Sequence, residues 1–169
     1  LTTYKTINSD NPKLNCRLNG LERFSPIKLI IDKDLKIKIN SNIIKSSKKF
    51  TTYIFHHSKN KKKMKKLKSY GVKLVKQDVK LDGYFDLYKL FKTIFNLGIQ
   101  NVLVECGKDL TYKMLKSGLI NEFFLFKSNN KIINREKLSI LSIYRLLKFF
   151  KKKKQVKTFL DKDTLIHYY

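Results

Sequence analysis

Apolar segments rich in β-branched residues alternate along this chain with segments of helical periodicity, and this alternation restricts the possible folds more than any other feature. Five segments predict strands by a run or an alternation of apolar residues: 26–32, 51–57, 71–76, 101–105 and 122–126. Three segments predict helices by their apolar spacing: 58–70, 84–97 and 110–117. Strands that alternate with helices predict an α/β fold with a largely parallel sheet.

The boundaries of these segments carry signals of their own. Ser58 is expected to cap the helix that follows it, and Gly71 and Gly98 stand just past two helix ends. The segment 101–105 is a near-continuous apolar run, which is typical of a strand covered on both faces. Residues 156–169 predict a terminal hairpin around Asp161-Lys162-Asp163, expected as antiparallel edge strands on the same sheet. Residues 129–154 give no clear pattern.

Length and composition exclude several classes of protein. A chain of 169 residues with 42% apolar and 30% charged residues can bury a core, so it is neither a disordered tail nor a linker. Its two cysteines, Cys16 and Cys106, are too few for a disulfide scaffold and too isolated for a zinc site. No apolar run approaches the roughly 20 residues that cross a bilayer, and no secretory signal opens the chain. We expect one soluble, cytoplasmic domain over residues 1–169.

The net charge of +25, from 38 Lys and Arg against 13 Asp and Glu, points by itself to nucleic acid. Only four of these cations are arginine, the residue that grips phosphate with two bonds, and the chain has no alanine. This pattern favours an AT-rich genome that placed lysine at exposed positions. Lys59–Lys66 is therefore predicted as a solvated helix face, with Met64 and Leu67 toward the core, and Lys151–Lys154 as a loop. Polyanion binding is the alternative for both runs.

Residues 104–110 carry the clearest chemical signal. A predicted strand ends at Glu105, Gly107 permits a tight turn and a helix begins directly afterwards. The first N–H groups of a helix lack internal partners and carry partial positive charge, so a phosphate binds there readily. Open α/β sheets also bind ligands beyond the carboxyl ends of their strands. The alternative is an ordinary turn with Asp109 as the cap and Glu105 in solvent.

Four motifs follow one another along the first three quarters of the chain. They are Asp10-x-Pro12-x-Leu14-x-x-Arg17, Ile30-Ile31-Asp32, Gly98-Ile99-x-x-Val102-Leu103-Val104-Glu105-x-Gly107 and Leu115-x-x-Gly118-Leu119-Ile120-x-Glu122. In this order they resemble the reductase domain of the bifunctional deaminase/reductase of riboflavin biosynthesis, the RibD C-terminal domain. The resemblance covers about residues 1–128 and, more loosely, 159–169.

This resemblance implies a fold similar to dihydrofolate reductase, in three layers, with a central, mostly parallel sheet and an antiparallel edge hairpin. It implies an NADPH-dependent reduction of 5-amino-6-(5-phosphoribosylamino)uracil, a phosphorylated pyrimidine, to the ribitylamino compound. The cofactor carries the hydride chemistry in such enzymes, so the protein positions the reactants and no catalytic side chain is expected. A homodimer and a deaminase domain in the same parent chain are also implied, with no metal, nucleic acid or membrane as a partner.

The resemblance also implies roles for individual residues. Leu14, Arg17 and Glu105 fall where the family contacts substrate, and Arg17 suits the ribosyl phosphate. Contacts with NADPH fall on eight positions: Thr6, Asp10, Lys33, Gly107, Lys108, Asp109, Leu110 and Thr111. Lys33 is a candidate for the 2′-phosphate, with an exposed lysine as the alternative.

This sequence departs from the family pattern in two ways. Cys106 stands where the family usually has Gly or Ala, and Lys108 where it often has Pro; neither change breaks the expected site. The family's first strand and helix, and the zinc-dependent deaminase domain, would precede Leu1, so this chain is expected to lack them. A basic nucleic-acid-binding module remains the alternative function.

The remaining chemistry-bearing side chains give weaker signals. His56 and His57 are adjacent on a predicted strand and point to opposite faces, so a shared metal is not expected. His167 is expected to be structural. Cys16 and Cys106 lack an obvious base, which argues against a nucleophile.

Overall fold

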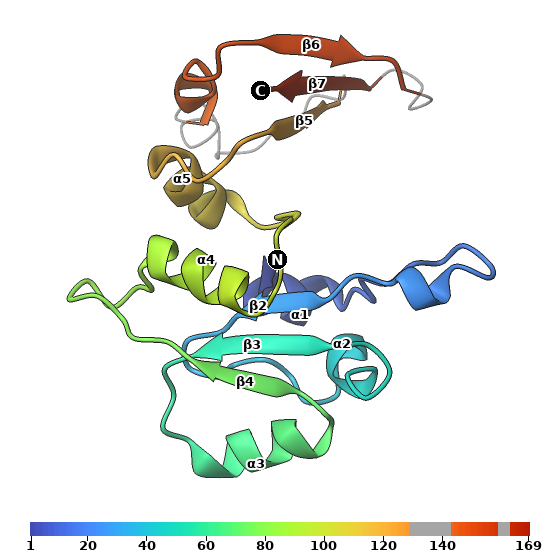
Figure 1. The fold of residues 1–169 in the computed structure, drawn as a ribbon, viewed down its shortest axis with the longest axis vertical. Coiled ribbons are helices and arrows are strands. Elements are labelled where there is room, and N and C mark those ends of the chain that lie inside the picture. The colour runs from blue at the N-terminus through green and yellow to red at the C-terminus, as the bar shows by residue number, and fades with distance from the viewer. Residues whose placement is uncertain (129–142, 159–162) are drawn as a thin grey trace. The chain divides into compact units, whose positions relative to one another are not determined.

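A computed structural model describes residues 1–128, 143–158 and 163–169 of the chain (Figure 1). The chain forms two compact units, Leu1–Cys106 and Gly107–Tyr169, and each is described by itself. Across these ranges, no helix combines the length and the apolar character that crossing a bilayer requires.

A four-stranded parallel sheet forms the centre of the first unit, in the order β1-β2-β3-β4. Its strands are β1 (Thr2–Thr3), β2 (Lys28–Ile31), β3 (Thr52–His56) and β4 (Lys73–Lys76). Ile30 lies opposite Ile54, and Ile31 opposite Phe55. β-Branched and aromatic side chains pack well on such a pleated surface. The strands predicted at 26–32, 51–57 and 71–76 are confirmed, as is the α/β class.

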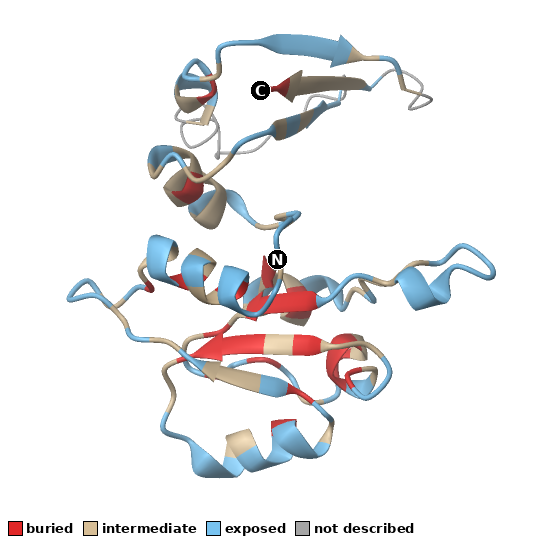
Figure 2. Ribbon diagram, in the orientation of Figure 1, coloured by how far each residue is buried: buried red, intermediate tan, exposed pale blue. Residues whose placement is uncertain are grey.

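Helices cover both faces of this sheet, so the first unit has three layers. They are α1 (Tyr4–Asp10), α2 (Asn42–Lys45), α3 (Lys61–Ser69) and α4 (Leu87–Asn96), with a short 3-10 helix η1 (Glu22–Phe24). Neighbouring residues of a strand point to opposite faces. Ile30 and Ile54 pack with residues of α1, α2 and α3, whereas Leu29 and Phe55 pack with residues of α4. Figure 2 shows this burial concentrated on β2 and β3.

The amino-terminal cap of α3 differs from the sequence expectation. Oδ1 of Asn60 accepts the N–H of Lys63 at 2.9 Å, whereas Oγ of Ser58 accepts only the N–H of Asn60, at 3.2 Å. The prediction of Ser58 as the cap is therefore wrong, because the loop continues for two residues before the helix begins. Leu67 is fully buried and Met64 packs on the core, as predicted for this lysine-rich helix.

The strand predicted at 101–105 does not form, and this prediction is wrong. The N–H of Leu1 donates to the carbonyl of Leu103 at 2.6 Å, and the N–H of Glu105 donates to the carbonyl of Leu1 at 2.9 Å. These bonds flank Val104 as in a parallel ladder, yet they involve a single partner residue. Leu103 is 80% exposed while Val102 packs on the core, so the segment is covered on one side only.

The second unit contains the helix α5, a short helical segment at 143–147 and a three-stranded antiparallel sheet in the order β5-β7-β6. Its elements are α5 (Lys108–Lys116), β5 (Phe123–Lys127), β6 (Lys153–Val156) and β7 (Thr164–Tyr168). The predicted helix at 110–117 and the strand at 122–126 are confirmed, and so is the second strand of the terminal hairpin, β7. The first strand of the hairpin was predicted wrongly, because β6 ends at Val156, where the predicted hairpin begins. The hairpin pairs with β5 rather than with a strand of the parallel sheet.

Two further sequence expectations concern this unit. The loop predicted at Lys151–Lys154 is wrong for Lys153 and Lys154, because both belong to β6 and pair with β7. Most of the unreadable region, residues 129–142, lies outside the described residues, as do residues 159–162.

Candidate active site

The carboxyl ends of the parallel strands define one edge of the first unit, where α/β sheets bind ligands. α1 begins directly after β1, so Thr6 lies in its first turn, half-buried, with Oγ1 3.4 Å from Oγ1 of Thr3. Lys33 leaves β2 at the same edge, because β1 and β2 are parallel and pair Thr3 with Ile31. The structure thus brings Thr6 and Lys33, two predicted cofactor contacts, to one edge.

Asp32 organises the loop that carries Lys33. Its carboxylate is fully buried and accepts the N–H groups of Lys36 and Ile37, each at 2.8 Å. Burial raises the pKa of Asp32, and the two hydrogen bonds oppose that rise. Nζ of Lys33 donates to the carbonyl of Gly83 at 3.1 Å. An ammonium has three donors, so Lys33 can hold this carbonyl and still meet an anion.

Glu105 stands at the end of the segment that runs beside β1. Its N–H holds the carbonyl of Leu1 at 2.9 Å, and its side chain is exposed. The segment runs parallel to β1, so its last residues lie toward the carboxyl edge, where Thr6 also lies. An exposed carboxylate at that edge is available to a ligand.

The loop after α1 lies at the amino-terminal edge of the sheet. Asn11 ends α1 in the left-handed region, with φ 45°. The N–H of Asn42 donates to Oδ1 of Asn11 at 2.8 Å, and Nδ2 of Asn42 donates to the carbonyl of Asn11 at 2.8 Å. α2 precedes β3, so these bonds hold the loop near the strand starts. Exposed Asp10 ends α1, one turn from Thr6 and on the same side of that helix.

Leu14 and Arg17 follow in this loop and are not brought to Lys33. Leu14 has φ 45°, a region that costs a side-chain-bearing residue about 1–3 kcal/mol, and it packs against the core. The N–H of Cys16 donates to Oγ of Ser25 at 3.1 Å, which ties the loop to the chain just before β2. Arg17 is exposed, and within residues 1–128 no ion pair engages it.

The first turn of α5 carries the remaining predicted cofactor contacts, within the second unit. Gly107 caps the helix with its carbonyl, which accepts the N–H and Oγ1 of Thr111, each at 3.2 Å. Gly107 has φ −70°, so the turn itself does not require glycine, and a Cβ built on it meets nothing within 4 Å. Lys108 and Asp109 are exposed, and Leu110 is half-buried. Asp109 lies in the first turn but is not the cap.

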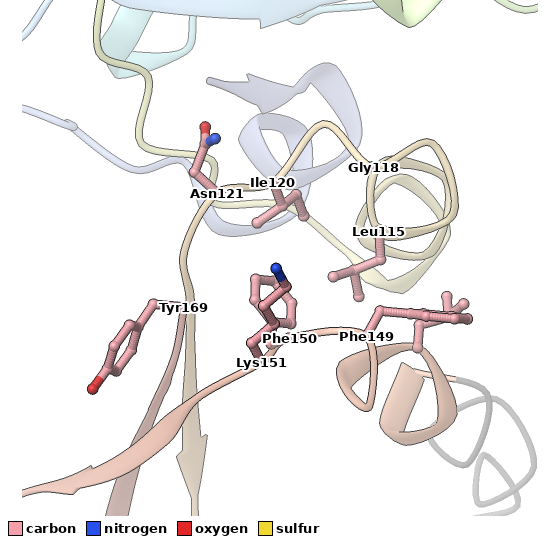
Figure 3. A pocket seen from close by; sticks show the side chains of 9 residues that line it. Leu115, Gly118, Ile120, Asn121, Phe149, Phe150, Lys151 and Tyr169 are labelled. Atoms are coloured by element: carbon pink, nitrogen blue, oxygen red, sulfur yellow. The ribbon is translucent and has the colours of Figure 1, made fainter.

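An open cavity of about 300 Å³ in the second unit has a mainly apolar lining that includes Leu115, Ile120 and Phe150 (Figure 3). Figure 3 shows the amide of Asn121 and the hydroxyl of Tyr169 turned away from its centre. Ligand sites combine apolar walls with a few convergent polar groups. None of the predicted site residues lines this cavity, and we assign no ligand to it.

Two of the three histidines, His57 and His167, have structural partners, whereas Nδ1 of the buried His56 has none among the described residues. Nδ1 of His57 lies 2.9 Å from the carbonyl of Gln77, and His56 is buried in β3. Nε2 of His167 lies 2.9 Å from Oε2 of Glu122, and its ring stacks on Phe124 with centroids 4.3 Å apart. In the part of the chain that the structure describes, no group of three or more His, Cys, Asp or Glu side chains could hold a metal ion.

Comparison with known proteins identifies the family. The profile of the RibD C-terminal domain matches residues 1–128. The chain belongs to the RibD C-terminal domain family. The riboflavin biosynthesis protein RibD of Actinobacillus pleuropneumoniae is 25% identical over 116 residues, which are 69% of this chain and 30% of that protein. The chain thus spans about a third of that relative's length.

Other relatives agree with this assignment. The 5-amino-6-(5-phosphoribosylamino)uracil reductase of Buchnera aphidicola is 28% identical over 161 residues, 88% of this chain and 73% of that protein. Acinetobacter baumannii RibD shares the fold with a TM-score of 0.68 at 18% identity, covering 99% of this chain and 45% of that one. A pyrimidine reductase-like protein of Corynebacterium diphtheriae has a TM-score of 0.71 at 14% identity, with coverage of 99% and 73%. The fold class inferred from the RibD resemblance is confirmed.

Proposed function

We propose that this RibD C-terminal domain reduces 5-amino-6-(5-phosphoribosylamino)uracil to its ribitylamino product with NADPH. The observation that carries the proposal is the family match over residues 1–128, together with a named reductase at 28% identity over 161 residues. The motif Glu105-x-Gly107 supports it, because it leads directly into the amino terminus of α5. No comparison supports the alternative of a nucleic-acid-binding module.

The residues predicted for NADPH suit a dinucleotide phosphate. In the second unit, Lys108 and the first N–H groups of α5 offer positive charge, and the space in front of Gly107 is open to a close approach. In the first unit, Lys33 and Thr6 offer an ammonium and a hydroxyl at the carboxyl edge. Asp109, Leu110 and Thr111 complete the α5 contacts, with Asp10 on α1. When bound, NADPH supplies the hydride.

The substrate contacts act by orientation and charge. The guanidinium of Arg17 is exposed and matches a phosphate with two parallel hydrogen bonds. Leu14 is held by backbone constraint and core packing, so it offers a fixed apolar surface. The carboxylate of Glu105 can accept hydrogen bonds from the amino groups of the pyrimidine. None of these roles requires a nucleophilic side chain, because the contacts position the substrate.

The direct test follows NADPH oxidation by the intact protein with the phosphoribosylamino-pyrimidine as substrate. Arg17→Gln is expected to raise KM for the substrate by about tenfold or more, because a charge-assisted bond to phosphate contributes about 1.5–3 kcal/mol. Arg23→Gln is the matched control, since Arg23 is an exposed arginine of η1 that lies 4.8 Å from the centroid of the Phe24 ring. Protein that turns over no substrate, or equal effects of both variants, would contradict the proposal.

A second variant addresses the cofactor separately. Gly107→Val is expected to weaken NADPH binding and leave the melting temperature nearly unchanged, because a Cβ at this position meets no atom within 4 Å. NADPH binding is measured by fluorescence in the absence of substrate. Undiminished NADPH binding by this variant argues against a phosphate contact at Gly107.

The assembly also belongs to this proposal. We expect a cytoplasmic homodimer whose parent chain carries a deaminase domain, in keeping with the share of the RibD relative that this chain spans. Light scattering of the intact parent protein measures the dimer, and a monomer at micromolar concentration would contradict it.

A further inference from the structure

A tight turn of residues 80–84, called the 80–84 turn below, follows β4 at the carboxyl edge of the parallel sheet. The N–H of Lys80 donates to the carbonyl of Tyr84 at 2.8 Å, and the N–H of Gly83 donates to the carbonyl of Lys80 at 2.8 Å. The N–H of Tyr84 also donates to Oδ1 of Asp82 at 2.9 Å. These hydrogen bonds fix the backbone of the turn.

Further hydrogen bonds join the 80–84 turn to the ends of β2 and β3. Nζ of Lys33, which lies just after β2, donates to the carbonyl of Gly83 at 3.1 Å. The N–H of His57, which follows β3, donates to the carbonyl of Lys33 at 2.8 Å, and Nδ1 of His57 lies 2.9 Å from the carbonyl of Gln77. Since Tyr84 follows Gly83 directly, its backbone is held close to the ammonium of Lys33.

The side chain of Tyr84 is accessible to a ligand. Tyr84 is 58% exposed, whereas its neighbour Phe85 is 9% exposed and belongs to the core. A tyrosine has only two rotatable side-chain bonds, so its ring offers a broad contact surface at a low cost in conformational entropy. Leu81, in the same turn, is fully exposed. The turn thus presents accessible apolar side chains beside a cation, at the edge where α/β sheets bind ligands.

An adenosine that carries a 2′-phosphate combines the two groups that Tyr84 and Lys33 can bind. Its base and its phosphate are attached to neighbouring carbons of one ribose, so a flat ring and a cation must lie close together to meet both. A tyrosine ring offers a face on which a base stacks. Lys33 has no ion pair among the described residues, and its ammonium keeps donors for a phosphate after it has met the carbonyl of Gly83.

We infer that Tyr84 is a specificity-determining residue, whose ring stacks on the adenine of NADPH while the ammonium of Lys33 meets the 2′-phosphate on the same ribose. Neither the sequence motifs nor the family resemblance implies a role for Tyr84. The inference rests on the proposed function, because it names a residue for the cofactor of that reaction. Selection of NADPH then depends on the 80–84 turn as well as on Lys33.

The test measures the binding of cofactor fragments to the intact protein without NADPH or substrate. Adenosine 2′-monophosphate, adenosine and nicotinamide mononucleotide are titrated at constant ionic strength and followed by NMR. Tyr84→Ala is expected to bind the two adenosine probes about tenfold more weakly, because the base loses its stacking partner, and to bind nicotinamide mononucleotide unchanged. Tyr84→Phe keeps the ring and should bind all three probes like the wild type. Lys33→Gln should weaken only adenosine 2′-monophosphate.

Phe95→Ala is the matched control. Phe95 is an exposed aromatic residue of the first unit, at 64%, in the last turn of α4. Its loss removes a similar aromatic surface from a different place and is expected to leave all three affinities unchanged. Since both Tyr84 and Phe95 are exposed, the variants are expected to keep the melting temperature of the wild type.

The inference is overturned by equal effects of Tyr84→Ala and Phe95→Ala, or by undiminished adenosine binding in Tyr84→Ala. A loss of nicotinamide mononucleotide binding in Tyr84→Ala also overturns it, because the other end of the cofactor then lies at the 80–84 turn. NADPH oxidation by the wild type tests the proposed function separately. An inactive protein whose adenosine binding still depends on Tyr84 would contradict the reductase activity and support this site.

Discussion

Asp32 is a fully buried carboxylate that closes the loop after β2 by accepting two backbone N–H groups. In Asp32→Asn, one of the two oxygens becomes an NH₂ group that faces an N–H donor. An unsatisfied buried donor costs about 1–3 kcal/mol, so we expect the free energy of unfolding to fall by that amount in urea titrations. Asp34→Asn is the control, since Asp34 is exposed and its only described ion pair is to Lys36, at 3.6 Å. Equal losses in the two variants would contradict this role of Asp32.

His56 makes the stability of the protein depend on pH. Burial, the largest cause, lowers the pKa of His56 below its ordinary value of 6.5, and the nearby His57, Lys76 and Lys68 lower it further. The unfolded chain therefore takes up the proton at a higher pH than the folded protein does. The stabilising contribution is complete above pH 6.5 and is lost as pH falls through the lowered pKa.

The measurement compares unfolding free energies of wild type and His56→Gln at pH values from 7.5 down to 5. The difference between the two proteins is expected to shift in favour of the variant as pH falls, and taking this difference removes the effect of Asp32. A constant difference between wild type and His56→Gln would contradict the prediction.

At the scale of elements, α3 is capped by Asn60 and not by Ser58, the residue that the sequence favours. Asn60→Ala removes the acceptor of the Lys63 N–H and is expected to reduce stability by about 0.5–2 kcal/mol, the usual contribution of such a cap. Ser58→Ala removes only a contact with the N–H of Asn60 and should have a smaller effect. Chemical denaturation of both variants decides between the two caps, and a larger loss for Ser58→Ala would favour the sequence-based assignment.

Apolar periodicity predicted most elements correctly, because the elements that bury them are close in sequence or cover both of their faces. β2 and β3 pair with each other, and helices pack on both faces of each strand, so a run of apolar residues is a sufficient signal for them. The segment 101–105 is similarly apolar, yet among the described residues only Leu1 forms backbone hydrogen bonds with it, and Leu103 faces solvent. A strand depends on its neighbours as much as on its residues, and those neighbours are distant in sequence. Asn11 ends α1 in the left-handed conformation, which asparagine adopts at some helix ends. The sequence interpretation did not use this signal.

The candidate site was predictable only as an ordered motif. No single residue type in it has a diagnostic spacing, and the structure places Thr6 and Lys33 at one edge of the sheet and Leu14 at the other. The Asn11–Asn42 contacts hold the loop of Leu14 near the strand starts, and they link positions 31 residues apart, which no local pattern in the sequence indicates.

At the scale of the whole molecule, the net charge of +25 sets how stability responds to salt. Repulsion among exposed charges is screened over a Debye length of about 10 Å at 0.1 M salt and about 3 Å at 1 M. α3 concentrates this repulsion, because Lys62 and Lys66 are one turn apart on an exposed surface. The melting temperature is therefore expected to rise with sodium chloride over this range.

Lys62→Glu tests whether the repulsion on α3 contributes to that response. The change replaces a like-charge pair by a Glu-to-Lys pair four residues apart in the favourable orientation, which is expected to add about 0.5 kcal/mol of stability at 0.1 M salt. The gain should vanish at 1 M, so the variant has the shallower dependence of melting temperature on salt. Lys62→Gln removes one charge without creating a pair and should fall between the two. Parallel salt dependences in all three proteins would show that α3 repulsion does not limit stability, and would place the salt response in the remaining lysines.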